Sequence, residues 1–590
     1  MTVSMDRRRV FTGAAAVLSL SAIAAQAIAQ TTPTPQAAPA RPDVKAFVKS
    51  PMIEDCSLSP DGKRIALITR VSAGYMLIVY DVVTKQAQTI GLGEFKIRGV
   101  FWGSNDNVIV TMTVTAGLEG YAGRKQEHRL VHNVDLRTGK MRALFDKMDG
   151  YHPTVQGDLE RVRVDGKYHV TASNYFMDGF SAPLELHLFD LDDGSSERLD
   201  SSATDTENWV LTPAGVPVAR AIFDRQLKRW QLEFRQPKRG WKKVFEQKEA
   251  IDHPSLIGLG RTERSVLIYI DAGEKAGNYY EVSEDGVLSE PLNPQDGSSS
   301  ACFHPTTRLF CGFARHDDWV AYDYIDPQMK KLAELAGKAM PNYNVKLYEF
   351  AAEDPRKVLL YGEANDDPGT YYFIDFASGN YIPVGENYPD LPPHWVTQKQ
   401  KMQYTAADGL EIHGYLTLPP PPALNGREAK NLPLIVLPHG GPNARDTSAF
   451  DWESQLYASR GYAVFQPNFR GSTGYGDAFV EAGYGQWGRK MQTDLSDGVR
   501  HLVKAGTVDA KRVCIVGASY GGYAALAGVT LDPGVYNCAV SVAGIGDLKA
   551  MLDYDASRSG GQLGTTALYM KRSLGSVKTF DEISPQKHVA

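Results

Sequence analysis

Residues 517–521, with the sequence GASYG, combine the residue types and the spacing that a nucleophilic serine needs. They follow an apolar run at 513–516, which predicts a strand, and they precede a helical run at 521–531. In such a strand–turn–helix context the turn is so tight that the serine oxygen projects above the sheet, next to the helix N-terminus. The bare spacing is common in a chain with 55 glycines, so its placement is the informative feature. We therefore predict that Ser519 is the nucleophile of a hydrolytic site.

A second segment supplies hydrogen-bond donors for the oxyanion that such a nucleophile generates. An apolar run at 432–437 leads into residues 438–442, PHGGP, which resemble the His-Gly-Gly oxyanion loops of acyl hydrolases. The backbone N–H groups of Gly441 and Tyr520 are the two predicted donors. His439 is interpreted as a brace of the loop, with a catalytic base as its alternative role. For the loop itself, the alternative is an ordinary tight turn.

These segments belong to a pattern typical of a parallel sheet flanked by helices. After residue 393, continuous apolar runs alternate with helical segments, which favours an α/β-hydrolase fold over residues 394–590, incomplete at its C-terminus. A hairpin at 402–418 precedes the sheet. The predicted strands are residues 432–437, 462–467, 513–516 and 538–542, and the predicted helices lie near 450–459, 491–504 and 521–531.

The front half has a different character, with short strand-like runs separated by Gly, Asp, Asn and Pro turns. A motif in which a strand ends on an aspartate before a turn, as at Asp81 and Asp375, recurs seven times with degenerate versions. Its interval is that of four-stranded propeller blades, and we predict a seven-bladed β-propeller over residues 45–393. A large β-sandwich is the alternative, and one short helix is expected near 329–339.

Three segments occur in order with consistent spacing: residues 439–442 (HGGP), 467–476 (PNFRGSTGYG) and 517–523 (GASYGGY). Together they resemble the catalytic domain of the prolyl oligopeptidase family, in its acylaminoacyl-peptidase and dipeptidyl-peptidase-like branch. The resemblance implies a serine peptidase that hydrolyses short peptides through an acyl-enzyme, with access gated by the propeller. An esterase and a binding protein without turnover are the alternatives. The 467–476 segment is expected to be structural.

The same fold requires an acid and then a histidine after the nucleophile. After Ser519 the only histidine is His588, which lies outside any predicted strand-end loop and follows a Ser-Pro pair that in relatives precedes the strand carrying the acid. Asp547, just beyond the last predicted strand, is considered only as an unusual substitute for the acid. We therefore expect the triad Asp and His to be absent from this chain, with on the order of 80 residues missing. This chain alone is then not expected to be a competent peptidase.

The N-terminus has the pattern of an export signal. Three arginines at 7–9 are followed by an apolar stretch at 13–28 and a small-residue cleavage site at 27–29. The paired arginines and the Ala- and Gly-rich stretch resemble a twin-arginine signal, with an ordinary secretory signal or an uncleaved anchor as the alternatives. We expect residues 1–29 to be removed, residues 30–44 to form a disordered linker, and the protein to be periplasmic or secreted from a bacterium.

Composition argues against several other classes of function. With a net charge of -6 and no basic run beyond the N-terminus, the chain lacks the electrostatic footprint of nucleic-acid binding. No further apolar run is long enough for membrane insertion. No Cys/His spacing indicates a metal site, so we expect neither metal nor cofactor, and peptide substrates are the expected partners. The sequence leaves open the oligomeric state, the peptide specificity and the choice between exopeptidase and endopeptidase.

Five cysteines are few for an exported protein. Cys302 and Cys311 flank a predicted turn between two short strands, where a cross-strand disulfide and two free thiols are both open alternatives. Cys514 and Cys538 lie in apolar runs and are interpreted as small buried hydrophobic residues.

Overall fold

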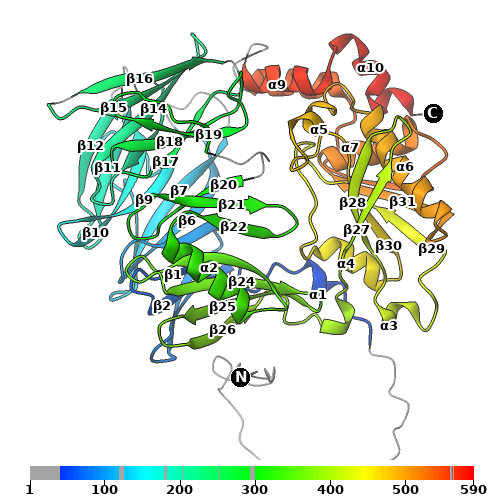
Figure 1. Cartoon of the computed structure of the whole chain (residues 1–590), viewed down its shortest axis with the longest axis horizontal. Coiled ribbons are helices and arrows are strands. Elements are labelled where there is room, and N and C mark those ends of the chain that lie inside the picture. The colour runs from blue at the N-terminus through cyan, green and yellow to red at the C-terminus, as the bar shows by residue number, and fades with distance from the viewer. Residues whose placement is uncertain are drawn as a thin grey trace, which may run out of the picture.

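The computed structural model describes residues 40–589, except 73, 119–124, 178–181, 203–204, 239, 250, 293–298, 559–560 and 562–563. The predicted signal at 1–29 and most of the predicted linker at 30–44 lie outside the described residues. The described chain forms two domains, a ring of antiparallel sheets and an α/β domain, which stand side by side in Figure 1.

Seven antiparallel sheets follow one another along the chain, and they are the blades of a propeller. Blades 1 to 4 consist of β1 (Asp55–Leu58), β2 (Arg64–Val71), β3 (Gly74–Asp81), β4 (Ala87–Gly93); β5 (Lys96–Trp102), β6 (Asn107–Ala116), β7 (Gln126–Asp135), β8 (Lys140–Ala143); β9 (Gln156–Val164), β10 (Lys167–Tyr175), β11 (Leu184–Asp190), β12 (Ser196–Ser202); and β13 (Thr206–Leu211), β14 (Pro217–Asp224), β15 (Arg229–Arg235), β16 (Trp241–Lys248). Blades 5 to 7 consist of β17 (Ser255–Leu259), β18 (Ser265–Ile270), β19 (Asn278–Ser283); β20 (Ser299–Phe303), β21 (Phe310–His316), β22 (Val320–Tyr324); and β23 (Asn344–Phe350), β24 (Lys357–Ala364), β25 (Asp367–Asp375), β26 (Asn380–Glu386). First strands of neighbouring blades contact each other around the ring, as β1 does with β5 and β23. The predicted seven-bladed propeller is confirmed.

Two blades differ from the prediction of four strands each, because blades 5 and 6 have three among the described residues. In blade 5 the position after β19 holds only an isolated bridge between Val282 and Leu288. In blade 6 the chain leaves β22 for helix α2 (Pro327–Ala339), the predicted short helix, which packs against β22 and β23. Asp326 caps this helix with its side chain, and Pro at the first position fits because that N–H has no helical partner. A capped helix therefore stands where a fourth strand was expected.

In the described chain no strand is shared between the last blade and the first, because every blade is built from consecutive strands, and hydrogen bonds and packing between blades 7 and 1 close the ring. Between blades 7 and 1 the Leu58 N–H donates to Glu349 Oε2 at 2.8 Å, and the Tyr348 hydroxyl donates to Asp55 Oδ1 at 2.7 Å. Apolar side chains of the two blades, Phe373 among them, share one buried cluster at this junction.

The second domain is a six-stranded sheet with helices, as predicted for an α/β-hydrolase fold. The strand order is β27 (Gln400–Thr405), β28 (Glu411–Thr417), β30 (Ala463–Asn468), β29 (Leu432–Val436), β31 (Val508–Ala518) and β32 (Cys538–Val542). Strands β30, β29, β31 and β32 run parallel, and the β27–β28 hairpin is joined to them through an antiparallel pairing of β28 with β30. The helices are α3 (Pro421–Leu424), α4 (Trp452–Ser459), α5 (Asp477–Glu481), α6 (Lys490–Lys504), α7 (Tyr520–Thr530), α8 (Leu548–Arg558), α9 (Thr565–Leu574) and α10 (Phe580–Ile583), with 3-10 turns η1 (Pro393–Trp395), η3 (Val577–Thr579) and η4 (Pro585–His588).

The core of this domain lies where α6 and α7 cover the central strands. Leu434 on β29, Phe465 on β30 and Ile515 on β31 are fully buried in one apolar cluster. Near-continuous apolar strands of this kind need cover on both faces, which explains why the sequence pattern predicted the sheet. The described sheet ends at β32, where Val540 and Val542 are 51% and 57% exposed, so this edge carries exposed apolar side chains.

The cysteines correct the sequence interpretation. Cys514 and Cys538, interpreted as buried thiols, are joined by a disulfide with their Cα atoms 4.7 Å apart. They are register partners on β31 and β32, which apolar composition could not reveal. Cys302 and Cys311 are free thiols, so the disulfide considered between them is not formed. Cys302 pairs with Gly312 instead, next to a register shift in the β20–β21 ladder.

Helix α1 (Lys45–Val48) lies against the α/β domain, beside α4, as Figure 1 shows. Phe47 is fully buried there with Trp395, and the Arg460 guanidinium lies 5.7 Å from the Phe47 ring centroid. The predicted propeller boundary at residue 45 thus precedes a segment that packs on the other domain, and the first propeller strand begins at Asp55.

Candidate active site

Ser519 stands between β31 and α7 in an unusual backbone conformation. Its φ of 57° and ψ of -119° are rare for a residue with a side chain, and such conformations cost on the order of 1–3 kcal/mol. The surrounding structure holds it there, because its N–H donates to the Val542 carbonyl at 3.0 Å. The residue is exposed. This is the geometry of a nucleophile elbow, at the carboxyl end of β31 as the sequence predicted.

The elbow and the predicted oxyanion loop touch, and the contact explains one glycine. A Cβ on Gly521 would lie 2.2 Å from the Pro438 carbonyl oxygen, so any side chain there would push the loop away. On the other side, a Cβ placed on Gly440 would lie 3.5 Å from the Cβ of Ser519. The sequence motifs 438–442 and 517–521 are therefore brought together.

The two predicted oxyanion donors lie in these adjoining segments. Within the part of the chain that the structure describes, neither the Gly441 N–H nor the Tyr520 N–H donates to a backbone carbonyl. Tyr520 is the first residue of α7, where N–H groups have no helical acceptor. Their roles as oxyanion donors stay predictions.

His439 braces the oxyanion loop. Its Nδ1 lies 2.7 Å from the Gly440 carbonyl and its Nε2 lies 2.9 Å from Ser472 Oγ. Its ring stacks on Phe469 with centroids 4.5 Å apart. Burial lowers the pKa of His439 to about 4, so the imidazole is neutral at neutral pH. With both nitrogens engaged inside the loop, the geometry agrees with the brace and not with a base for Ser519.

The 467–476 segment holds this loop from the other side. Asn468 Nδ2 donates to the Asp446 carbonyl at 3.0 Å, and the Thr473 N–H donates to the Ala444 carbonyl at 3.0 Å. Arg470 is buried and forms a bidentate pair with Asp494 of α6, with Nε–Oδ2 and Nη2–Oδ1 distances of 2.8 and 2.7 Å. These contacts give the segment the structural role that was expected.

Asn443 is a loop residue that the sequence analysis did not single out. Its Nδ2 donates to the Gly471 carbonyl at 3.0 Å, and its Oδ1 accepts from the hydroxyl of Tyr569 on α9. It therefore ties the oxyanion loop to two other segments. Its position directly after the PHGGP motif was the only available signal, because Tyr569 is 126 residues away in sequence.

Within the described residues, no general base contacts Ser519. Among the described residues no histidine nitrogen hydrogen-bonds its hydroxyl, which also makes no cap bond to α7. His588 is exposed on η4, with Nε2 3.0 Å from the Asp581 carbonyl. Asp547 accepts from the Ala550 N–H at 3.0 Å and so begins helix α8. Neither His588 nor Asp547 is seen in a triad arrangement with Ser519.

The described residues contain no cluster of three or more His, Cys, Asp or Glu side chains that could hold a metal ion. Across the same residues, no helix has the length and apolar character to cross a membrane.

Known proteins resemble this chain in sequence and in fold. Residues 448–589 match the prolyl oligopeptidase family. The dipeptidyl aminopeptidase BIII of Pseudoxanthomonas mexicana is 26% identical over 531 residues, which are 86% of this chain and 72% of that protein.

Two solved structures share the fold. A puromycin-hydrolyzing peptidase of Mycobacterium tuberculosis has a TM-score of 0.61 at 19% identity, covering 92% of this chain and 84% of the other. The acylaminoacyl peptidase of Pyrococcus horikoshii has a TM-score of 0.59 at 15% identity, covering 92% and 85%. At these identities the likeness establishes the arrangement of a propeller and an α/β-hydrolase domain.

Proposed function

We propose that the chain is a serine peptidase of the prolyl oligopeptidase family, which its residues 448–589 match, and that it acts on short peptides through an acyl-enzyme on Ser519. The observation that carries the proposal is the exposed, strained elbow at Ser519 with the Gly440 loop packed against it. The relative named a dipeptidyl aminopeptidase and the fold neighbour named an acylaminoacyl peptidase support a peptide substrate.

In the proposed reaction Ser519 Oγ attacks the carbonyl carbon of the scissile peptide bond. The hydroxyl proton passes to a base, and the oxyanion is held by the N–H groups of Tyr520 and Gly441. The C–N bond then breaks, the leaving amine takes up the proton, and water hydrolyses the ester to release the acid and regenerate the serine. The acid and base that this scheme needs are not among the residues at the described site.

The test has to separate the role of Ser519 from the supply of a base. We would compare the 590-residue chain with the gene product extended to its next natural stop codon, each with and without Ser519→Ala, on peptide amides and on matched esters. We expect turnover only in an extended protein with Ser519, because loss of the histidine base alone lowers kcat by a factor of about 2 × 10⁶ in the serine protease subtilisin. Ser519→Ala should leave the melting temperature unchanged, since an exposed side chain contributes little packing.

Several outcomes would contradict the assignment. Amide hydrolysis that survives Ser519→Ala would remove Ser519 from the mechanism. Ser519-dependent turnover by the 590-residue chain would show that its base lies elsewhere in this sequence. Cleavage of esters alone would support an esterase. A binding protein would be supported if the extended protein bound peptides but neither turned them over nor was labelled by a fluorophosphonate.

We also propose that the protein is exported and that its mature form begins near Gln30, outside the cytoplasm of a bacterium. The arginines at 7–9 and the apolar stretch at 13–28 support this. N-terminal sequencing of the protein from its native host, together with cell fractionation, tests it. Recovery with Met1 intact, or in the cytoplasmic fraction, would count against export.

A further inference from the structure

A cavity of about 500 Å³ lies in the propeller and not at Ser519. It is lined by residues of blades 2, 3, 4, 6 and 7, among them Phe101, Arg161, Pro213, Thr306 and Glu349. Side chains from so many blades meet only on the axis of the ring, so this cavity belongs to the central channel.

The cavity lies at the end of the channel that faces away from the α/β domain. Its lining residues sit where first strands end and second strands begin: Tyr168 lies at the start of β10, Arg308 between β20 and β21, and Glu353 between β23 and β24. Contacts with the α/β domain come from the opposite ends. Glu363, near the end of β24, accepts from the Phe450 N–H at 2.9 Å.

Two side-chain pairs cross this far end of the channel. Arg308 of blade 6 meets Glu160 of blade 3, with Nη2 and Oε2 2.6 Å apart. The Tyr168 hydroxyl of blade 3 donates to Glu353 Oε1 of blade 7 at 2.9 Å. Blades 3 and 6, like blades 3 and 7, are as far apart as two members of a seven-bladed ring can be.

Contacts between neighbouring blades fix the residues beside these pairs. Arg161, next to Glu160, donates from Nη1 to the Trp102 carbonyl of blade 2 at 2.7 Å. Thr306, near Arg308, donates to the Ala352 carbonyl of blade 7 at 2.6 Å. The crossing side chains therefore extend from a braced rim, which lowers the entropy that the two pairs must overcome.

We propose that the Arg308–Glu160 and Tyr168–Glu353 pairs close the far end of the propeller channel, so that peptides reach Ser519 only between the two domains. The statement about peptides rests on the proposed function, whereas the closure itself does not. The pairs are then specificity-determining: they leave the shape of the interdomain entrance to decide which peptides are admitted.

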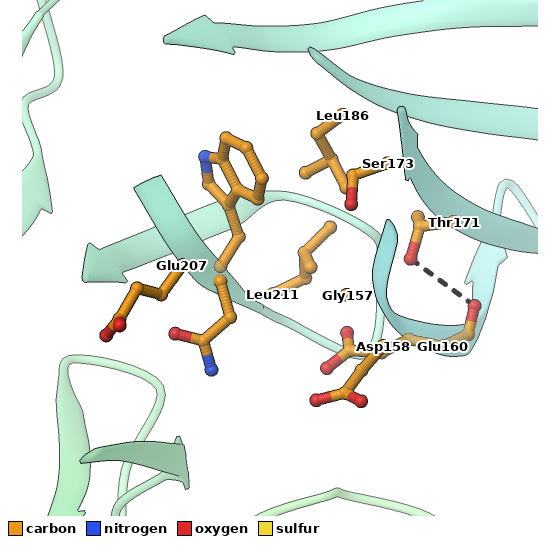
Figure 2. Close-up of a pocket in the computed structure, with 10 residues that line it drawn as sticks. Gly157, Asp158, Glu160, Thr171, Ser173, Leu186, Glu207 and Leu211 are labelled. Atoms are coloured by element: carbon orange, nitrogen blue, oxygen red, sulfur yellow. Dashed lines mark hydrogen bonds between the residues drawn. The ribbon is translucent and has the colours of Figure 1, made fainter. Parts of the chain in front are cut away.

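A thiol placed just inside the pairs reports on closure without any substrate. Asp158 is suitable because it lies two residues before Glu160 on β9, about 7 Å along the strand. Figure 2 shows the two carboxylates beside each other at a small pocket that they share with Glu207. We would introduce Asp158→Cys into the full chain and measure its rate of alkylation by N-ethylmaleimide, with the chain lacking this substitution as the blank for native thiols.

The decisive comparison is between an opened and a re-closed far end. Arg308→Glu with Tyr168→Phe places like charges opposite each other and removes the second hydrogen bond, so alkylation should accelerate several-fold. Adding Glu160→Arg restores the first pair in reverse and should slow it again. Lys338→Glu, an exposed charge change on α2 that does not line the cavity, should leave the rate within about twofold of the parent.

Either of two results overturns closure: an opened variant that alkylates at the parental rate, or a re-closed variant that stays as fast as the opened one. If Arg308→Glu prevents cooperative melting, Arg308→Gln with Tyr168→Phe removes the first charge and the second hydrogen bond, and the parent chain is then its closed reference. Because neither peptide nor Ser519 takes part, these results stand whether or not the protein is a peptidase.

Discussion

At the scale of single residues, burial shifts the pKa values of two groups at the oxyanion loop in opposite directions. Burial lowers the pKa of His439 to about 4 and raises the pKa of Asp446 to about 7. One hydrogen bond partly offsets the burial of the Asp446 carboxyl group, because its Oδ1 accepts from Gln466 Nε2 at 3.0 Å. Both groups are therefore uncharged near pH 6, and charging either one inside the loop works against the fold.

The two shifts predict opposite effects of acid on stability. Between about pH 6.5 and 4 the unfolded chain binds a proton at His439 that the folded chain does not, so this residue makes stability fall as the pH falls. Asp446 contributes a pH dependence of the opposite sign, and Asp446→Asn removes it, so that only the His439 effect remains. Urea unfolding of Asp446→Asn should therefore show a loss of about 2 kcal/mol between pH 7 and pH 5.

His439→Gln is the matched variant with the opposite sign. Between about pH 7 and 4 the folded chain keeps a proton on Asp446 that the unfolded chain releases, so this residue alone makes stability rise as the pH falls. His439→Gln should gain about 2 kcal/mol over the same interval, while the parent changes less than either variant. Parallel pH profiles for the two variants would contradict the assignment.

At the scale of elements, Arg470 joins three elements of the α/β domain. It follows β30, pairs with Asp494 on α6, and reaches Asp408 in the β27–β28 turn with Nη1–Oδ2 and Nη2–Oδ1 distances of 2.8 and 2.9 Å. The Asp494 side chain is fully buried, whereas that of Asp408 is 32% exposed. The two carboxylates therefore depend on the arginine to different degrees.

Removal of Arg470 should lower stability strongly, because it leaves the buried Asp494 carboxylate without its partner. We expect Arg470→Ala to lower the free energy of unfolding by about 3–5 kcal/mol. Asp408→Asn, which weakens only the more exposed pair, should cost about 1 kcal/mol or less. Urea denaturation of both variants measures the difference, and equal losses would show that burial of Asp494 is not the cause.

Elements were predictable from sequence where local patterns decide them. The elbow at Ser519, the strands of the sheet and the repeat of the blades all follow from periodicity and turn residues close together in the chain. The Cys514–Cys538 disulfide was not predictable, because it depends on which residues face each other in the β31–β32 register. The three-stranded form of blade 6 was missed although α2 was expected, because that helix replaces a strand only through its packing on β22 and β23. The partners of Asn443 and Asp446 likewise depend on tertiary contacts.

At the scale of the whole molecule, one buried carboxylate gathers the contacts between blade 6 and the α/β domain. Asp318 accepts from the Tyr415 hydroxyl, pairs with Lys401, and lies 3.6 Å from Arg445 Nη2. Its side chain is 7% exposed, whereas that of the neighbouring Asp317 is 76% exposed. Arg445 follows the oxyanion loop, so this contact also bears on the candidate site.

Asp318→Asn should loosen the contact between the domains, because an amide cannot replace a carboxylate that serves three donors. We expect faster cleavage of the interdomain linker near residue 390 by proteinase K, which does not depend on Lys or Arg, and a larger radius of gyration by small-angle scattering. Asp317→Asn is the matched comparison: its carboxylate lies 3.5 Å from the same Arg445 Nη2 but is 76% exposed, so its loss should change both measurements much less. Unchanged scattering for Asp318→Asn would show that the domains are held together elsewhere.

The position of α1 has a consequence for synthesis on the ribosome. Phe47 is buried in the same cluster as Trp395 and Ala423 and against Leu456, so its binding site is translated about 350 to 400 residues after the helix itself. At about 5–20 residues per second, the nascent chain carries this unpaired aromatic for roughly 20–80 s while the propeller folds. Helix α1, made before the propeller, can therefore dock only after the propeller has been translated, once residues up to about 456 of the second domain have emerged.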